Sequence, residues 1–443
     1  MHIEMGRVKF GDCFVISNNC DKLIVDCGSK NKGSGKLAYN ELLTMVNLNT
    51  CKLNLLISHF DDDHYNGILE IDESSNTGLF NNIYISAYLH NNKTAINNIG
   101  YLIALGLEKK YSSNYPKNLC ELFIKIPKLI NKNGKLILVK SNTEVHVGND
   151  KFISIWPDIN PNNISIDFDD TIWKNILDKL FNLEISFKEL NKGNESKYNH
   201  NNFMSLNIEN SVNIFSNSLE NYMNYFYEGT IEKVIEAGQE LKISLERILE
   251  INKDVNKFYN KIKLLVREAP TLNNNISFFH NYNNFQKKIN IQYKILIKDM
   301  NSSSIIMHKD NDILFLGDAP PKIIKNLSQK GLIMKTYQAI KVQHHGTINY
   351  FYQDMPRAKF YLISNGGYKN RKISEKFIEY ADFICCSNAW EDLGYCEYFS
   401  KNKRCSYKCI KNLLCLDFDC QNKIICNIDY PCMYKTCQKL CSV

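Results

Sequence analysis

The sequence lacks a long uninterrupted run of apolar residues, although 44% of its 443 residues are hydrophobic. A transmembrane helix needs about 20 consecutive, mostly apolar residues, so no membrane span is predicted. The first residues, Met1-His2-Ile3-Glu4, also lack the basic start and apolar stretch of a secretion signal. These two absences predict a cytoplasmic protein.

Cysteine is absent between residues 121 and 384, yet the chain has 16 cysteines, of which eleven lie between Cys385 and Cys441. This tail has no Cys-x-x-Cys pair, and no histidine follows His345, which argues against a zinc finger of the usual spacing. Three interpretations of the tail stay open: structural zinc in Cys₄ sites, disulfides in an oxidising compartment, or cysteines without a ligand. The possible tail ligands are Cys405, Cys409, Cys415, Cys420, Cys426, Cys432, Cys437 and Cys441.

A strong charge bias is also missing, because 54 basic and 47 acidic residues give a net charge of +7. This mild excess is compatible with anionic partners but does not require them. The ordinary hydrophobic and charged fractions indicate a globular protein that can bury a sizeable core. At roughly 150 residues per domain, the length suggests two or three units.

The chain divides into four segments by pattern. Residues 1–160 alternate short apolar runs with amphipathic stretches, which predicts strands and helices of an α/β domain. The first two runs, Phe14–Ile16 and Leu23–Asp26, predict a hairpin. Further strands are expected over Ile83–Leu89, Leu136–Val139 and Phe152–Trp156, and helices over 101–107 and Leu119–Leu129. Residues 161–295 have apolar residues at three- and four-residue spacing and predict a mostly helical insertion, which could bind a protein partner. Strand-like runs return over 296–390, at Ser304–Met307, Ile313–Leu316, Ala339–Val342 and Phe360–Ile363, and a helix is expected over Pro321–Gln329. Residues 391–443 form a cysteine-rich C-terminal module. Four aromatic residues of the insertion could stack on bases, although core packing is the commoner role: Tyr222, Tyr225, Phe226 and Tyr227.

Four possible metal ligands follow the buried-strand run from Leu53 to Ser58. They are His59, Asp61, Asp63 and His64, within six residues. Imidazole and carboxylate groups together suit divalent transition metals. The alternative interpretation of this segment is a solvated acidic turn.

Two later strand-like runs end in residues of the same chemical kind. Leu314-Phe315-Leu316 ends in Gly317-Asp318, and Lys341-Val342-Gln343 ends in His344-His345-Gly346. Each segment alone is a weak signal. Because all three follow strands, their combination predicts a shared metal site.

These motifs resemble those of the metallo-β-lactamase-fold hydrolases. Within them, His59-x-Asp61-x-Asp63-His64 is similar to the variant found in the hydrolase domain of the DNA-uptake competence (ComEC) family. The resemblance covers about 1–160 and 295–390. It includes four further segments: Gly11-Asp12-Cys13-Phe14, Asp26-Cys27-Gly28, Asn301-Ser302-Ser303-Ser304 and Ile363-Ser364-Asn365-Gly366.

The resemblance implies a four-layer αβ/βα sandwich with two divalent metal ions at one edge of its sheets. His59 and Asp61 would hold the first ion, Asp63, His64 and His345 would hold the second, and Asp318 would bridge both. His344 is the less favoured member of the histidine pair.

One family feature is missing, since Trp156 stands where the family usually has another histidine for the first ion. Asp158 or His146 could substitute for it. Asp61, Asp63 and Asp318 make the site rich in oxygen, so Mn²⁺ rivals Zn²⁺ as the bound ion.

The resemblance further implies a phosphodiesterase or nuclease in which a metal-activated hydroxide attacks phosphorus. Asp63 and Asp318 are the candidate catalytic residues, and Lys369 and Arg371 could contact the phosphate of a nucleic acid or nucleotide. Two alternatives stay open: a hydrolase of a lactone, thioester or amide, and a metal-deficient module that binds nucleic acid or protein. The oligomeric state is also open.

Overall fold

The computed structural model describes most of the predicted hydrolase segments and only part of the insertion and tail. The described residues are 1–30, 34–48, 52–73, 78–87, 115–158, 300–365, 374 and 376–386, parts of 214–247, and three short strands between 409 and 425. The chain forms two compact units. Unit 1 comprises Met1–His90, Lys128–Ile164 and Lys298–Val443, and unit 2 comprises Asn91–Pro127 and Ser165–Ile297.

Unit 1 contains two mixed sheets, each with eight strands among the described residues. The first has the order β16-β15-β1-β2-β3-β4-β5-β6, with parallel pairing from β3 to β6 and antiparallel pairing elsewhere. Its strands are β1 (His2–Met5), β2 (Cys13–Asn18), β3 (Asp21–Cys27), β4 (Lys52–Ile57), β5 (Phe80–Ser86), β6 (Ile130–Val139), β15 (Cys415–Phe418) and β16 (Ile424–Ile425).

The second sheet has the order β14-β13-β12-β11-β10-β9-β8-β7. It is antiparallel from β7 to β10 and parallel from β10 to β14. Its strands are β7 (Glu144–Val147), β8 (Asp150–Trp156), β9 (Ile306–Lys309), β10 (Ile313–Phe315), β11 (Thr336–Lys341), β12 (Arg357–Ile363), β13 (Ala381–Cys386) and β14 (Cys409–Ile410). The fold is therefore mixed α/β and compatible with an α/β sandwich.

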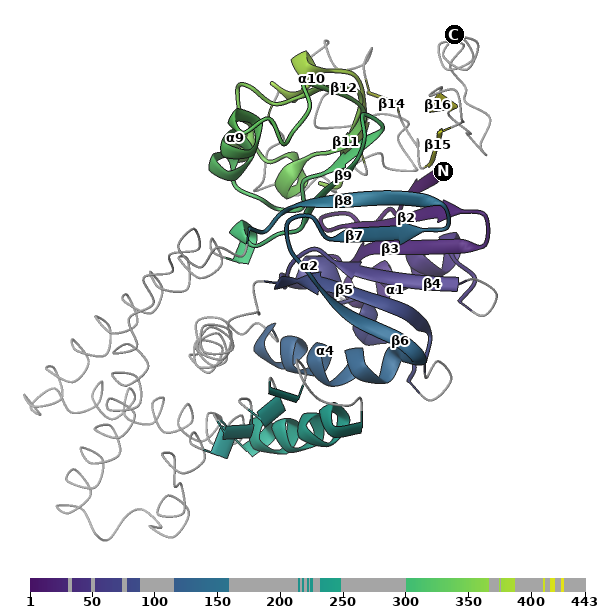
Figure 1. Cartoon of the computed structure of the whole chain (residues 1–443), viewed down its shortest axis with the longest axis vertical. Helices are drawn as coiled ribbons and strands as arrows, with labels where there is room; N and C mark the ends of the chain where they lie inside the picture. Colours follow the sequence, from purple (N-terminus) through teal and green to yellow (C-terminus); the bar gives the residue numbers. More distant parts are fainter. Residues whose placement is uncertain are drawn as a thin grey trace, which may run out of the picture. The chain divides into compact units, whose positions relative to one another are not determined.

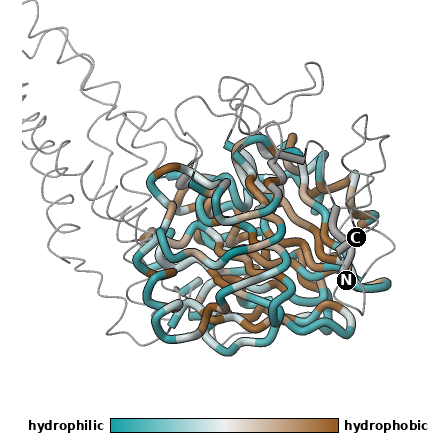
Figure 2. The backbone as a smooth tube through the Cα atoms, turned by 90° about the horizontal axis from the view of Figure 1, so that it is seen from above, coloured by the Kyte–Doolittle hydropathy of each residue, from teal (hydrophilic) through white to brown (hydrophobic). Residues whose placement is uncertain are grey.

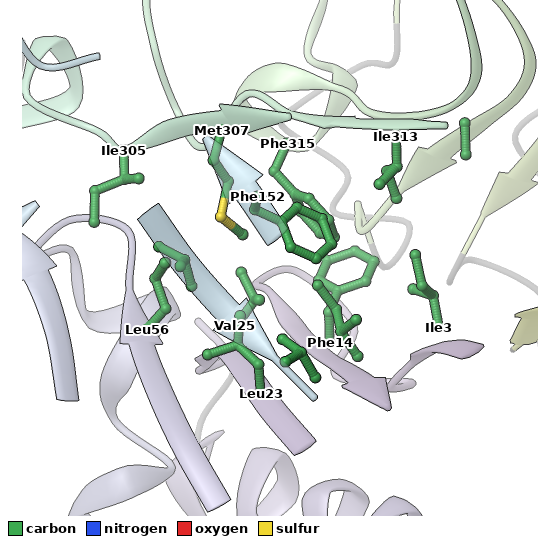
Figure 3. Packing of buried hydrophobic residues seen from close by; sticks show 14 of the residues in the cluster. Ile3, Phe14, Leu23, Val25, Leu56, Phe152, Ile305, Met307, Ile313 and Phe315 are labelled. Atoms are coloured by element: carbon green, nitrogen blue, oxygen red, sulfur yellow. The ribbon is translucent and has the colours of Figure 1, made fainter. Parts of the chain in front are cut away.

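One apolar cluster joins the two sheets. Figure 3 shows Phe14, Val25 and Leu56 of the first sheet pointing toward Phe152 and Phe315 of the second. The Phe315 ring meets Phe14 edge-on, with ring centroids 5.8 Å apart. Burying each such side chain stabilises the fold by about 1.5–3 kcal/mol. In Figure 2 the hydrophobic backbone segments gather in the interior of this part of the chain.

Helices pack on the sheets rather than between them (Figure 1). α1 (Ser34–Met45) contacts β2 and β3. α9 (Pro321–Gln329) places Ile324 and Leu327 in a second apolar cluster on the other face of the second sheet, and Phe377 of α10 (Phe377–Tyr380) joins it. None of the helices that the structure describes is both long and apolar enough to cross a membrane.

Several predicted elements are confirmed. β2 and β3 form the antiparallel hairpin expected for the first two apolar runs. The helix predicted over Pro321–Gln329 is α9, and the helix predicted over Leu119–Leu129 lies within α4 (Tyr115–Leu129). The helix predicted over 101–107 lies outside the described residues.

Parts of the insertion and tail are described. Residues 232–247 are helical, and the hydroxyl of buried Tyr222 donates a hydrogen bond to the carbonyl oxygen of Phe123, which favours core packing for this aromatic residue. Tail strand β14 pairs with β13, and β15 pairs with β1, so these segments extend the two sheets. Phe226, Tyr227 and the side chains of the tail cysteines lie outside what the structure describes.

Candidate metal centre

The three predicted ligand segments meet at one edge of the two sheets. They follow β4 of the first sheet and β10 and β11 of the second, each at the carboxyl end of its strand. Short helical turns hold the first and third segments, namely α2 (Asp62–Tyr65) and η4 (Gln343–Gly346). The second segment turns at Gly317, whose φ of +50° suits glycine.

Backbone contacts fix the first ligand segment against the β2–β3 hairpin. Asp12 N donates to Asp63 O at 3.0 Å, and Gly67 N donates to Cys27 O at 2.8 Å. A Cβ atom added at Gly28 would lie 2.3 Å from the carbonyl carbon of Asp63. Only glycine allows this close approach, so the hairpin sets the position of the ligand segment.

Gly28→Ala is therefore expected to displace Asp63 and His64 and to weaken metal binding at least about tenfold, because the clash is with backbone. Isothermal titration with Mn²⁺ checks this. The matched control is Gly238→Ala, where an added Cβ meets only ordinary contacts of 3.4 Å and more in a helix. Unchanged metal affinity in Gly28→Ala would contradict this explanation of the hairpin.

Three buried histidines of the site have their Nδ1 atoms turned toward supporting groups. His64 Nδ1 lies 2.8 Å from Asp26 Oδ2, and His59 Nδ1 lies 3.1 Å from Ser58 Oγ. The Ser58 hydroxyl in turn donates to Asp26 at 2.7 Å. His345 Nδ1 faces Asp12 Oδ1 at 3.4 Å. Hydrogen bonds such as those of His64 and His59 fix the tautomer and orientation of metal-binding histidines, whereas the longer His345 contact is an ion-pair distance.

The opposite nitrogens of these histidines converge on carboxylates. His64 Nε2 lies 3.5 Å from Asp318 Oδ1, and His345 Nε2 lies 3.4 Å from Asp63 Oδ2 and 3.6 Å from Asp318 Oδ2. His59 Nε2 lies 3.8 Å from Asp61 Oδ2 and 3.9 Å from Asp318 Oδ2. Two ligand atoms that each bind one tetrahedral ion at about 2.1 Å are separated by about 3.4 Å, so these spacings suit ligands that share an ion.

Buried polar atoms of this cluster also lack hydrogen-bond partners among the described residues. They include Nε2 of His59, His64 and His345 and an oxygen each of Asp63 and Asp318. Leaving such atoms unpaired is costly unless another partner binds them. One ligand atom each from Asp12, His64, Asp318 and His345 lies within 4.8 Å of the others, and this buried group could hold a metal ion.

A buried lysine, Lys341, contacts two carboxylates of the cluster. The Lys341 ammonium forms an ion pair with Asp12, donates to Gly317 O at 3.0 Å and lies 3.7 Å from Asp318 Oδ1. Lysine is almost never fully buried without a paired charge. Lys341 therefore supplies a fixed positive charge to the carboxylates of the site.

His344 contacts the cluster through Asp318 and packs on Tyr350. Its Nδ1 lies 2.8 Å from Asp318 Oδ2, and its ring stacks on Tyr350 with centroids 3.9 Å apart and an interplanar angle of 5°. Both His344 and His345 have left-handed backbone angles, with φ of 46° and 56°. Such conformations in non-glycine residues cost about 1–3 kcal/mol each and are concentrated at functional sites.

The charges of the cluster shift each other's protonation. Burial alone raises the pKa of Asp318, but His345, His344 and His64 outweigh it and hold this pKa well below its ordinary value. Burial lowers the pKa of His64, but Asp318 and Asp26 raise it well above normal. Burial likewise raises the pKa of Asp12, and the opposing Lys341 and His345 lower it to about 2. A bound cation would replace protons on these histidines.

The structure brings all seven predicted central ligands together: His59, Asp61, Asp63, His64, Asp318, His344 and His345. Trp156, which stands where the resemblance leads one to expect another histidine, donates from Nε1 to Ser302 O at 2.6 Å. His146 lies exposed on β7 and pairs with Glu144 at 3.1 Å, away from these ligands in the strand order. Lys369 and Arg371 lie outside the described residues.

Sequence reasoning did not assign Asp12, Lys30 and Lys341 to the site. Asp12 and Lys341 nevertheless lie within two segments that carry the family resemblance, Gly11–Phe14 and Lys341–Gly346. A lysine inside an otherwise apolar strand was the available signal for Lys341, because a buried lysine needs a buried partner.

Comparison of the sequence with protein-family models gives no match, and comparison with curated proteins gives none.

Proposed function

We propose that this chain is a metal-dependent hydrolase with a dinuclear site that cleaves phosphodiester bonds, as in the competence-type branch of the metallo-β-lactamase fold. The two mixed sheets, packed face to face with helices on their outer faces, are compatible with the four-layer sandwich of that family. The motif resemblance and the geometry of the buried cluster support the proposal together.

The convergence of the three histidine Nε2 atoms on Asp61, Asp63 and Asp318 carries the proposal. Their Nδ1 atoms are directed at Ser58, Asp26 and Asp12 instead. A cluster built only for stability would pair both nitrogens of its buried histidines. A metal site needs one nitrogen of each histidine turned inward without a protein partner.

Asp12 belongs to the buried group by distance, but we assign it a supporting role. Its contacts with both histidines of the group are to Nδ1, at 3.5 Å for His64 and 3.4 Å for His345. Its carboxylate already contacts the Lys341 ammonium, which would repel a cation bound there. Asp12 would thus orient His345 as Asp26 orients His64.

The fixed charges favour two divalent ions over one. Five buried carboxylates lie in the cluster, those of Asp12, Asp26, Asp61, Asp63 and Asp318. Among the described residues, two lysines contact them, Lys30 and Lys341. One divalent ion would leave the site negative when its histidines are neutral, which disfavours an anionic substrate. Two would make it positive.

His59, Asp61 and His344 would hold the first ion, Asp63, His64 and His345 the second, and Asp318 both. Bound divalent cations would lower the pKa of water and stabilise negative charge on a phosphoryl group. The chain's own residues would position the reactants: the oxygen of Asp63 that lacks a hydrogen-bond partner could orient the attacking water and accept its proton. The mixed nitrogen and oxygen donors suit Zn²⁺ and Mn²⁺.

The test is a panel of single-stranded DNA, duplex DNA, RNA and bis(p-nitrophenyl) phosphate, each with Mn²⁺ or Zn²⁺. We expect cleavage of at least one phosphodiester by wild type and a loss of about 10²–10³-fold in Asp63→Asn, because Asp63 holds both the ion and the water. Asp62→Asn is the matched control, since the neighbouring Asp62 is partly exposed. If wild type cleaved none of these four phosphodiesters with either metal ion, the proposed bond would be contradicted. Equal activity in wild type and Asp63→Asn would contradict the proposed site.

A further inference from the structure

Lys30 projects from a rigid segment beside the metal-binding cluster. Lys30 N donates to Phe10 O at 2.7 Å. The preceding residue, Ser29, donates from its backbone N to Asn66 Oδ1 at 3.1 Å and from its hydroxyl to Val8 O at 2.5 Å. The base of the Lys30 side chain is therefore held in place even though its ammonium extends outward.

The ammonium lies at the boundary between the ligands and solvent. It is 3.5 Å from Asp63 Oδ2 and 5.8 Å from the centre of the Phe10 ring, and the side chain is 38% exposed. The Phe10 ring packs on His345, with centroids 4.2 Å apart. Lys341 differs because its side chain is only 3% exposed. Of these two lysines, Lys30 is the one that an anion from solvent can meet.

We propose that Lys30 binds a negatively charged oxygen of the substrate, which makes the site selective for phosphate esters over neutral esters. This inference rests on the proposed function. A partly exposed ion pair such as Lys30–Asp63 is weak. A cation bound by Asp63 would weaken it further by neutralising the carboxylate and repelling the ammonium. The partly exposed ammonium can then attract a phosphoryl oxygen a short distance from the same ion, as lysines commonly do.

Titration of inorganic phosphate into the Mn²⁺-loaded full-length protein tests this without relying on catalysis. We expect Lys30→Gln to weaken phosphate binding about tenfold while Mn²⁺ binding stays unchanged, and Lys30→Arg to recover most of the phosphate affinity. The control is Lys335→Gln, an exposed lysine just before β11, the strand whose other end carries Lys341. Unchanged phosphate affinity in Lys30→Gln overturns the inference. A parallel fall in Mn²⁺ affinity also overturns it, because Lys30 would then act on the metal ligands.

A second measurement compares bis(p-nitrophenyl) phosphate with the neutral ester p-nitrophenyl acetate. For Lys30→Gln we expect kcat/KM to fall about tenfold with the phosphodiester and to change little with the neutral ester. An equal fall with both overturns the inference. If wild type cleaves neither compound, the proposed function loses this support, whereas the phosphate titration still decides the role of Lys30.

Discussion

Asp318→Asn is expected to lower the hydrolytic activity by at least about 10²–10³-fold and to remove most of the metal, because this residue contacts histidines of both other ligand segments. Its oxygens lie 2.8 Å from His344 Nδ1, 3.5 Å from His64 Nε2 and 3.6 Å from His345 Nε2. An amide keeps the shape of the side chain but lacks the negative charge that would bridge two ions. Metal analysis and kinetic assays on the same preparation measure both effects.

The control for this variant is Asp312→Asn. Asp312 and Asp318 flank the same short strand, β10, but Asp312 pairs with Lys309 at 2.9 Å and makes no contact with the cluster in the part of the chain that the structure describes. We expect its metal content and activity to match wild type. If Asp318→Asn retained full metal and full activity, Asp318 could not be the bridging ligand.

Lys341→Met is expected to lower the free energy of unfolding of the metal-free protein by about 3–5 kcal/mol, the usual cost of removing one partner of a buried ion pair. The variant leaves Asp12 and Asp318 without the ammonium that lies between them. Urea denaturation without metal measures the loss. Added Mn²⁺ should restore more stability to Lys341→Met than to wild type, because the ion supplies the missing positive charge.

The double variant Asp12→Asn/Lys341→Met separates the charge effect from lost packing. If the cost arises from an unpaired Asp12 carboxylate, the double variant should be more stable than Lys341→Met alone. An equal or lower stability would show that packing, not charge, explains the loss. A metal-free Lys341→Met protein as stable as wild type would contradict the role assigned to Lys341.

The sequence was sufficient to predict which histidines and aspartates cluster, because their signal is local; that they bind metal stays a prediction. His59, Asp63, Asp318 and His345 each follow an apolar strand, and ligand chemistry at strand ends is visible in the printed residues. Which of His344 and His345 reaches the cluster cannot be read from neighbouring residues. It depends on the left-handed backbone conformation of both, which turns both rings into the cluster.

The supporting residues could not be predicted in the same way. Asp12 precedes β2 of the first sheet, whereas Lys341 belongs to β11 of the second sheet and His345 follows that strand. Asp12 therefore contacts Lys341 and His345 only because the two sheets pack against each other. Contacts between sheets depend on how the sheets pack, which no single strand pattern specifies. The same limit applies to Lys30, whose position depends on the Phe10 carbonyl across the hairpin.

The fold was predicted best where strands are buried. The central strands β4, β10 and β11 are mostly buried, and each overlaps the apolar run from which it was predicted. The edge strand β6 extends over Ile130–Val139, whereas only Leu136–Val139 was predicted. Its first half contains Asn131, Lys132 and Asn133 and therefore shows no apolar run. An edge strand can expose such polar residues to solvent. At one edge of the second sheet, β7 is short and alternates exposed and buried residues, so it has no apolar run to detect.

The metal content of the cluster tests the central claim most directly, provided that any ion in the cysteine-rich tail is subtracted. Full-length wild type and the Asp63→Asn/Asp318→Asn variant share the same tail, so the difference in their metal content counts only the ions of the cluster. We expect this difference to be about two divalent ions per chain, as in dinuclear hydrolases. A difference of one would contradict the dinuclear site, and no difference would contradict the metal centre itself.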